Sequence, residues 1–223
     1  MLLEIPEILA PAAVGDVVAA LAGSQFVDGR ATAGKAARTV KRNEEGQLPP
    51  QQMQNLYRLI ITALAQSPRF RSAALPLSVS DPIFARYRPG MTYGDHIDDP
   101  VMGAGKRFRS DIAVTVFLNE PDRYDGGELV VRTSFGDRRV KLAAGHAVVY
   151  PASSLHQVAP VTRGERIVAV CWVQSMVRSP EQRELLYELD LARESLLEAD
   201  PNATAAQQVN RAYLNLIRMW AEV

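Results

Sequence analysis

The fold is decided by the stretch RIVAVCWVQSMV, residues 166–177 of this 223-residue chain. Its β-branched and aromatic residues are typical of a β-strand. The stretch also contains Cys171, the single cysteine, so disulfides within the chain are excluded, which fits a reducing, cytoplasmic setting. The apolar neighbours of Cys171 predict a buried structural thiol rather than a nucleophile.

Similar short segments run from about residue 76 to residue 177. They are rich in β-branched and aromatic residues, are separated by clusters of Gly, Pro, Asp or Ser, and read IFARYR, DIAVTVFLNE, GELVVRT, RRVKL and HAVVYP. Because no pattern of helical length intervenes, they predict an antiparallel sandwich or barrel rather than a parallel α/β sheet. The sequence SFGD at 134–137 predicts a hairpin turn between two of the strands.

Helical patterns flank this strand-rich region on both sides. Apolar residues recur at helical spacing in APAAVGDVVAALAG, residues 10–23, and in QQMQNLYRLIITALAQS, residues 51–67. After Pro180, two further helical segments divided by DPN at 200–202 predict an αα-hairpin. The polar, glycine-containing segment 28–50 is predicted to be irregular and to lie outside the core.

Together these elements predict an α+β fold with a mainly β core. We expect one domain over residues 1–177, made of a helical N-terminal part (1–75) and a β core (76–177), followed by a C-terminal helical extension over 178–223. The extension carries apolar residues that can be buried within the chain or in a homo-oligomer interface: Leu214, Ile217 and Trp220.

Charge and hydropathy exclude several partners. Twenty-five basic residues balance twenty-five acidic ones, and the sequence pI is about 6.8, so no global field attracts nucleic acid or an anionic membrane. No apolar run approaches the roughly 20 residues that a membrane span requires. The N-terminal stretch carries Glu4 and Glu7 and lacks a basic leader, so it does not resemble a signal peptide.

The stretch DHIDD at 95–99 holds the first candidate metal ligands. His96 and Asp98 are two residues apart, so in an extended segment their side chains point to the same side. A second histidine, His156, follows sixty residues later at the start of another strand. Two histidines and one carboxylate are the ligand set of the non-haem Fe(II) facial triad, which leaves coordination positions open, whereas a fourth protein ligand would favour a closed zinc site.

Two further residues are candidates for binding a cosubstrate. Arg166 lies ten residues after His156 and begins an otherwise apolar strand, so its guanidinium can project into the barrel and bind a dicarboxylate. Tyr87, nine residues before His96, can add a hydroxyl donor to the same carboxylate or can be a core aromatic. Arg163 is the competing arginine, but we expect it to be solvated in the turn TRGE.

Other polar residues near these motifs have weaker claims. Asp95 and Asp99 point to the opposite face and are interpreted as solvated carboxylates, with ligand orientation as the alternative. His146 is interpreted as structural or surface-exposed, and Glu128, in GGEL, as exposed beside a tight turn or bulge. The basic segment 29–42 is either a solvated loop or a cover over the site.

Several segments together resemble the PKHD-type hydroxylases, bacterial Fe(II)/2-oxoglutarate-dependent dioxygenases related to prolyl 4-hydroxylase catalytic domains: RYRPGMTYGDHIDDP, YDGGELVV, AGHAVVYPASSLHQVAPVTRGERIVAVCWVQSMVR, TAGKAARTVKRNEEGQL and RSPEQRELLYELDLARESL. The resemblance covers nearly the whole chain and implies a double-stranded β-helix, or jelly roll. It also implies that His96, Asp98 and His156 bind Fe(II), that Arg166 anchors 2-oxoglutarate, and that L-ascorbate keeps the iron ferrous.

The resemblance implies a hydroxylase in which 2-oxoglutarate is converted to succinate and CO2, while leaving a small-molecule or a peptidyl substrate open. Two alternatives come from other classes. A non-catalytic cupin-like binding module would not need Arg166 inside the barrel. A zinc-dependent hydrolase would need a general base, for which only Asp95 or Asp99 is available. Demethylation of nucleic acid is disfavoured by the neutral charge.

The position of the carboxylate ligand can be tested with neighbouring aspartates. We expect Asp98→Ala to abolish iron-dependent turnover while largely preserving the fold, because it removes a metal ligand, and Asp99→Ala to have a mild effect. Turnover of 2-oxoglutarate and circular dichroism of both variants measure this. Equal loss of activity in both variants would contradict the assignment of the two residues to opposite faces.

Overall fold

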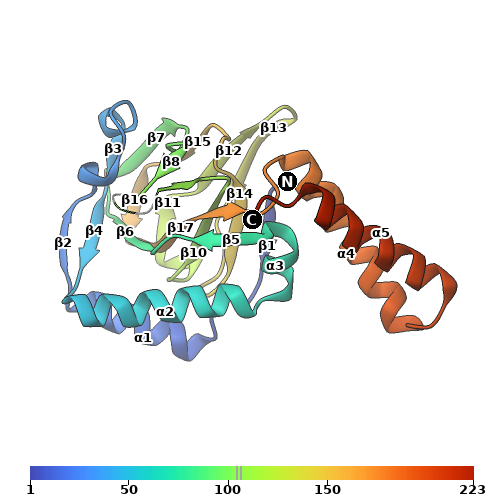
Figure 1. Cartoon of the computed structure of the whole chain (residues 1–223). Helices are drawn as coiled ribbons and strands as arrows, with labels where there is room; N and C mark the ends of the chain where they lie inside the picture. Colours follow the sequence, from blue (N-terminus) through green and yellow to red (C-terminus); the bar gives the residue numbers. More distant parts are fainter. Residues whose placement is uncertain (104, 106) are drawn as a thin grey trace.

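The structure is a computed structural model that describes residues 1–103, 105 and 107–223 (Figure 1). Two facing antiparallel sheets form its core. The larger sheet has the order β1 (Leu3–Ile5), β14 (Ala147–Pro151), β10 (Ile112–Phe117), β17 (Arg166–Ser175), β6 (Ile83–Tyr87), β4 (Glu44–Gln47) and β2 (Gln25–Asp28), with β5 (Pro76–Val79) also paired with β17. The smaller sheet has the order β13 (Gly136–Val140), β12 (Leu129–Thr133), β15 (His156–Val158), β7 (Thr92–His96) and β3 (Lys41–Arg42).

Two short antiparallel pairs lie outside these sheets, β8 (Val101–Met102) with β9 (Phe108–Arg109), and β11 (Tyr124–Gly126) with β16 (Val161–Gly164). The prediction of an antiparallel β core flanked by helices is therefore confirmed, and two facing antiparallel sheets are the arrangement of a jelly roll. The predicted hairpin turn is also present, because Thr133 pairs with Gly136 where β12 meets β13.

Strand β17 separates two apolar layers because its side chains alternate between the two faces of the larger sheet. Cys171 and Val173 pack in the layer between this sheet and the helices. Val168 and Trp172 point the other way, into the space between the two sheets. Cys171 is buried, as predicted, and burial raises the pKa of its thiol to about 12. Position 166 therefore falls on the inner face.

Helices α1 (Pro11–Ala22) and α2 (Pro50–Gln66) run along the outer face of the larger sheet (Figure 1). Val17, Ile60 and Leu64 lie on their inner sides with no measurable exposure. Burial of each such side chain stabilises the fold by about 1.5–3 kcal/mol. The short helix α3 (Pro68–Ala74) follows α2, and its first turn is capped by the Ser67 hydroxyl, which accepts from the Phe70 amide.

The prediction for segment 28–50 is wrong. Instead of an irregular stretch outside the core, it contains the 3-10 turns η1 (Gly29–Thr32) and η2 (Ala37–Thr39), followed by β3 and β4. Strand β3 extends the smaller sheet beside β7, and β4 extends the larger sheet beside β6. The predicted helical part over 1–75 thus also supplies the strands β1 to β4. Pairing with distant strands, which local pattern does not reveal, overrides the polar composition.

The C-terminal hairpin consists of α4 (Pro180–Ala199) and α5 (Thr204–Trp220) and projects away from the sheets (Figure 1). Leu186 and Tyr213 join a small separate core with Leu75 and Val177. Four large apolar residues on the hairpin are exposed: Leu185, Leu191, Leu214 and Met219. Homo-oligomerisation through this hairpin remains a prediction. In the described part of the chain, no helix is long and apolar enough to cross a membrane.

Adjacent leucines test how the hairpin is anchored. Leu186 is 0% exposed, whereas Leu185 is 62% exposed. We expect Leu186→Ala to lower the free energy of unfolding by about 2–5 kcal/mol through loss of burial and a residual cavity. Leu185→Ala is the matched control and should change it by less than about 0.5 kcal/mol. Urea unfolding of both variants measures the difference, and equal effects would show that Leu186 does not pack as described.

Candidate metal centre

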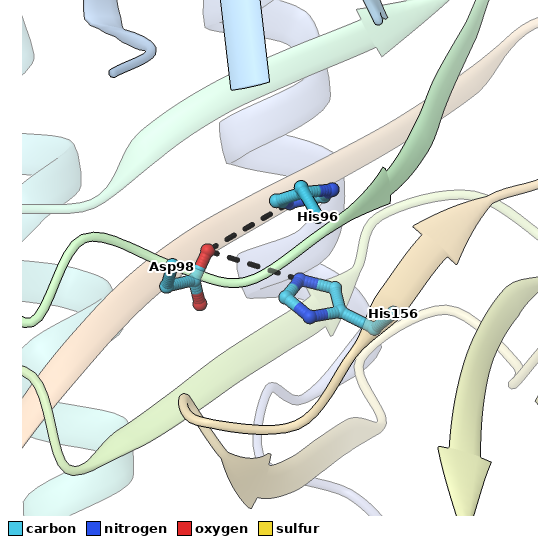
Figure 2. A group of neighbouring side chains, drawn as sticks. All are labelled: His96, Asp98 and His156. Atoms are coloured by element: carbon cyan, nitrogen blue, oxygen red, sulfur yellow. Dashed lines mark ion pairs between the residues drawn. The ribbon is translucent and has the colours of Figure 1, made fainter. Parts of the chain in front are cut away.

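Three side chains, His96, Asp98 and His156, point toward one another (Figure 2). His96 ends β7, His156 begins β15, and the register of these strands places the two histidines opposite each other. The Nε2 atom of each imidazole lies 3.8 Å from Oδ1 of Asp98. One ligand atom from each residue can be chosen so that all lie within 4.8 Å of one another. The structure thus brings together the three residues singled out from the sequence.

Backbone carbonyls orient both imidazoles. Nδ1 of His96 lies 2.7 Å from the Gly94 carbonyl oxygen, and Nδ1 of His156 lies 2.9 Å from the Ser154 carbonyl oxygen. Because a carbonyl only accepts, each Nδ1 carries the proton and donates it. The lone pair of each Nε2 is therefore available on the side that faces Asp98. This is the second hydrogen bond that metal-binding histidines ordinarily make.

Two tyrosine rings pack against the imidazoles of His96 and His156. The Tyr93 ring stacks on His96 with centroids 3.5 Å apart, and the Tyr150 ring meets His156 edge-on at 5.1 Å. The imidazole side chains are 5% exposed, so they have little freedom to rotate. The two imidazoles are consequently preorganised for binding a metal.

The electrostatics of this group favour a bound cation. Burial, together with the nearby His156, lowers the pKa of His96 to about 4, so its imidazole is neutral at neutral pH. Burial raises the pKa of the Asp98 carboxyl, because the pocket supplies too little positive charge for a carboxylate. A divalent ion would compensate that carboxylate and could accept the lone pairs of the two Nε2 atoms, so the donor set fits such an ion.

Asp98 is held by a residue that sequence reasoning missed. The Nε1–H of Trp172 donates to Oδ2 of Asp98 at 2.8 Å, which leaves Oδ1 directed at the histidines. Trp172 lies on β17 six residues after Arg166, so strand alternation places both on the inner face. That period-two spacing is the signal that could have identified Trp172 in the sequence.

Arg166 is a buried cation without an ionic partner. It is 1% exposed, and no carboxylate of the described residues lies within 4.0 Å of its guanidinium. Its Nε has no hydrogen-bond partner. It pairs across the strands with Tyr87, and its guanidinium carbon lies 5.1 Å from the Tyr87 ring centroid. Because an unpaired buried charge is strongly unfavourable, the surroundings of Arg166 fit an anionic ligand.

A glycine makes room for this arginine. Gly127 has a φ of +68°, and a Cβ at this position would lie 3.0 Å from Cδ of Arg166. Both the backbone conformation and the close approach therefore favour glycine. The sequence GGEL thus forms the turn into β12 that was expected, with a register shift at Gly126, but Glu128 is half-buried rather than exposed.

The candidate ligands and Arg166 line one small cavity of about 60 Å³. It adjoins an open cleft of about 690 Å³, and the two share Lys41, Ile83, Tyr93, Asp98 and Trp172. The larger cleft has the size of a typical ligand site, about 300–1,000 Å³. Segment 29–42 contributes Thr32, Ala33, Gly34, Ala37 and Lys41 to its wall, so this segment borders the site.

The remaining candidates lie away from the three convergent side chains. Asp95 is exposed and forms an ion pair with Arg132 at 3.1 Å. Arg163 is exposed as predicted, although it lies in β16 rather than in a turn, and it pairs with Asp125 at 2.7 Å. Asp99 is exposed on the wall of the larger cleft. His146 is half-buried and lies just before β14.

Comparisons with known proteins agree on one family. The model of the 2OG-Fe(II) oxygenase superfamily matches residues 82–174, and that of the PKHD-type hydroxylase C-terminal domain matches residues 181–222. A PKHD-type hydroxylase of Thioalkalivibrio sulfidiphilus is 51% identical over 100% of both chains.

Solved structures share the fold. A Pseudomonas putida prolyl-4-hydroxylase has a TM-score of 0.53 at 21% identity, covering 78% of this chain and 92% of its own. A viral collagen prolyl hydroxylase from Paramecium Bursaria Chlorella virus-1, solved as a 2OG complex, has a TM-score of 0.54 at 18% identity, covering 78% and 95%. These similarities support the jelly-roll fold predicted from the sequence.

The hydrogen bond from Trp172 can be tested without turnover. Trp172→Phe removes the donor to Asp98 but keeps an aromatic ring, so we expect the affinity for a divalent metal to fall about 10-fold or more. Calorimetric titration with Mn(II) measures this effect, and Trp220→Phe in the C-terminal hairpin is the control. Unchanged affinity in Trp172→Phe would show that the Asp98 carboxylate is oriented by other contacts.

Proposed function

Since this chain belongs to the PKHD-type hydroxylase family of the 2OG-Fe(II) oxygenase superfamily, we propose that it hydroxylates its substrate with conversion of 2-oxoglutarate to succinate and CO2. The chain is an oxidoreductase and a dioxygenase by family. The observation that carries the proposal is the small cavity itself, which has three convergent metal-binding side chains and an unpaired buried arginine in one lining.

In this proposal, His96, Asp98 and His156 hold Fe(II) and leave the remaining coordination positions for other ligands. When bound, the iron supplies dioxygen activation, which no side chain of the protein provides. The protein holds the ligands in place through the Nδ1–H bonds and through Trp172. Burial of all three side chains limits the access of water.

Arg166 and Tyr87 are the proposed anchor for the distal carboxylate of 2-oxoglutarate. A guanidinium binds a carboxylate through two parallel hydrogen bonds and stays charged even when it is buried. Burial raises the pKa of Tyr87 to about 12, so its hydroxyl stays protonated and can donate. Tyr87 lies directly across from Arg166 in the register of β6 and β17, which places both groups at the same end of the cavity.

The prime substrate is proposed to bind in the larger cleft, which shares Asp98 and Trp172 with the small cavity. Either a peptidyl side chain or a small molecule is compatible with its size. We extend the proposal to L-ascorbate as the reductant that keeps the iron ferrous, on the basis of the family resemblance alone. The two alternatives have less support, because neither a binding module nor a hydrolase needs an unpaired, buried Arg166. Of the two acids that could serve as the hydrolase base, Asp95 is paired with Arg132, and Asp99 is exposed on the wall of the larger cleft.

The cosubstrate assignment can be tested by anaerobic titration of the Fe(II)-loaded protein with 2-oxoglutarate. A chelated keto acid gives a weak visible metal-to-ligand charge-transfer band, which we expect to observe. Arg166→Ala should weaken binding of 2-oxoglutarate about 100-fold, because it removes a buried charged partner. Arg163→Ala, an exposed arginine of the same segment, is the control and should bind like the wild type. Metal binding without a band in the wild type would overturn the proposal.

A further inference from the structure

Lys41 is a buried lysine to which the roles above give no function. Its side chain is 8% exposed, on the edge strand β3, opposite Tyr93 of β7. Its Nζ lies 2.7 Å from Oε1 of Glu45 and 2.8 Å from Oγ1 of Thr32. Lysine is rarely buried to this degree, and only when it is paired. Glu45 satisfies that requirement but does not explain why the pair lines the cavity.

Part of the explanation is mechanical. Lys41 belongs to the smaller sheet and Glu45 to the larger one, so their ion pair joins the two sheets in the lining of the small cavity. This clip uses two of the three N–H groups of the ammonium. The third has no partner among the described residues. Since Lys41 lines both the small cavity and the larger cleft, a ligand in either one can reach it.

Aromatic stacking places this ammonium at the metal end of the cavity. Nζ of Lys41 lies 5.2 Å from the centroid of the Tyr93 ring, and that ring stacks directly on His96. Arg166 lies instead against Tyr87 and Phe117, at 5.1 and 5.5 Å from their ring centroids.

The cavity therefore has a cation near the metal ligands and a second cation in a different set of contacts. We propose that Lys41 is a second binding residue for 2-oxoglutarate, donating its free N–H to the carboxylate beside the keto group, while Arg166 binds the distal carboxylate. This inference rests on the proposed function. Glu45 is then a positioning residue that holds the ammonium in place.

The chemistry of the cosubstrate supports this division. A carboxylate that chelates a metal through one oxygen leaves its other oxygen needing a donor in a buried site. The free ammonium N–H is suited to it, and a charge-assisted bond is among the stronger hydrogen bonds. Charge is also balanced, because Arg166 and Lys41 offset Asp98 and Glu45, and a divalent cation offsets a dianionic cosubstrate.

Binding of two keto acids, 2-oxoglutarate and pyruvate, can distinguish the contributions of Lys41 and Arg166. Pyruvate has the keto group and the adjacent carboxylate of 2-oxoglutarate but lacks the distal carboxylate. We expect Lys41→Met to weaken binding of both acids to the Fe(II)-loaded protein by a similar factor, roughly 10- to 100-fold. Arg166→Met should weaken 2-oxoglutarate and leave pyruvate nearly unchanged. Anaerobic calorimetry measures these affinities without turnover.

The spectrum distinguishes a direct contact from a structural role. Loss of a hydrogen bond to the chelating carboxylate should move the maximum of the charge-transfer band in Lys41→Met, whereas Arg166→Met should leave the maximum in place. Lys35→Met, which changes an exposed lysine of the same segment, is the control. Wild-type affinities and an unmoved band in Lys41→Met would overturn the proposal and leave Lys41 as a clip between the sheets.

A second variant keeps the test decisive if Lys41→Met does not fold. Lys41→Arg can retain the ion pair with Glu45, but its planar donors lie in different positions, so we expect a moved band and intermediate affinity for pyruvate. An unmoved band with wild-type affinity in this variant would also overturn the proposal. If the wild type shows no charge-transfer band with 2-oxoglutarate and none with pyruvate, this result would instead contradict the proposed function.

Discussion

The pairing of β7 with β15 is the constraint on which the site depends, because its register places His96 opposite His156. A slip of one residue would turn one imidazole to the other face of the smaller sheet, since side chains alternate along a strand. The chain then needs only two more residues to bring Asp98 between them. One strand pair thus brings together two histidines that are sixty residues apart in the sequence. The rigid sheet also supplies the positional precision that a metal site requires.

Unsatisfied polar groups mark the rest of the site. A protein core ordinarily pairs its buried charges, yet Arg166 has no carboxylate within 4.0 Å among the described residues and its Nε has no partner. The Asp98 carboxylate is likewise under-compensated, as the raised pKa of this group indicates. Both deficits lie in the lining of one cavity, so a cation and an anion binding together would relieve them. The stability that these two unpaired groups cost the fold would then be regained as affinity for the ligands.

Much of this arrangement can be predicted from the sequence. The strands of the core are apolar, and the two-residue spacing of His96 and Asp98 places their side chains on the same side of an extended segment. The segment that contains Lys41 and Glu45 could not be placed in the same way. Its two short strands are polar, and they exist because β7 and β6 offer them partners. The burial of Lys41 depends on Glu45, in the other sheet, and a contact between two sheets does not appear as a repeating pattern in the sequence. Trp172 is intermediate, since alternation from Arg166 indicates its face but not its bond to Asp98.

Different kinds of element carry the residues of the small cavity and part of the wall of the larger cleft. Strands of the two sheets carry His96, His156, Arg166 and Trp172, so the groups proposed to bind metal and cosubstrate are held by backbone hydrogen bonds between strands. The larger cleft is bordered in part by turns and short strands, including segment 29–42 and the β8–β9 pair. Loops tolerate change better than ladders, and substrate preference commonly lies in them. Membership of the family therefore constrains the class of reaction far more than it constrains the substrate.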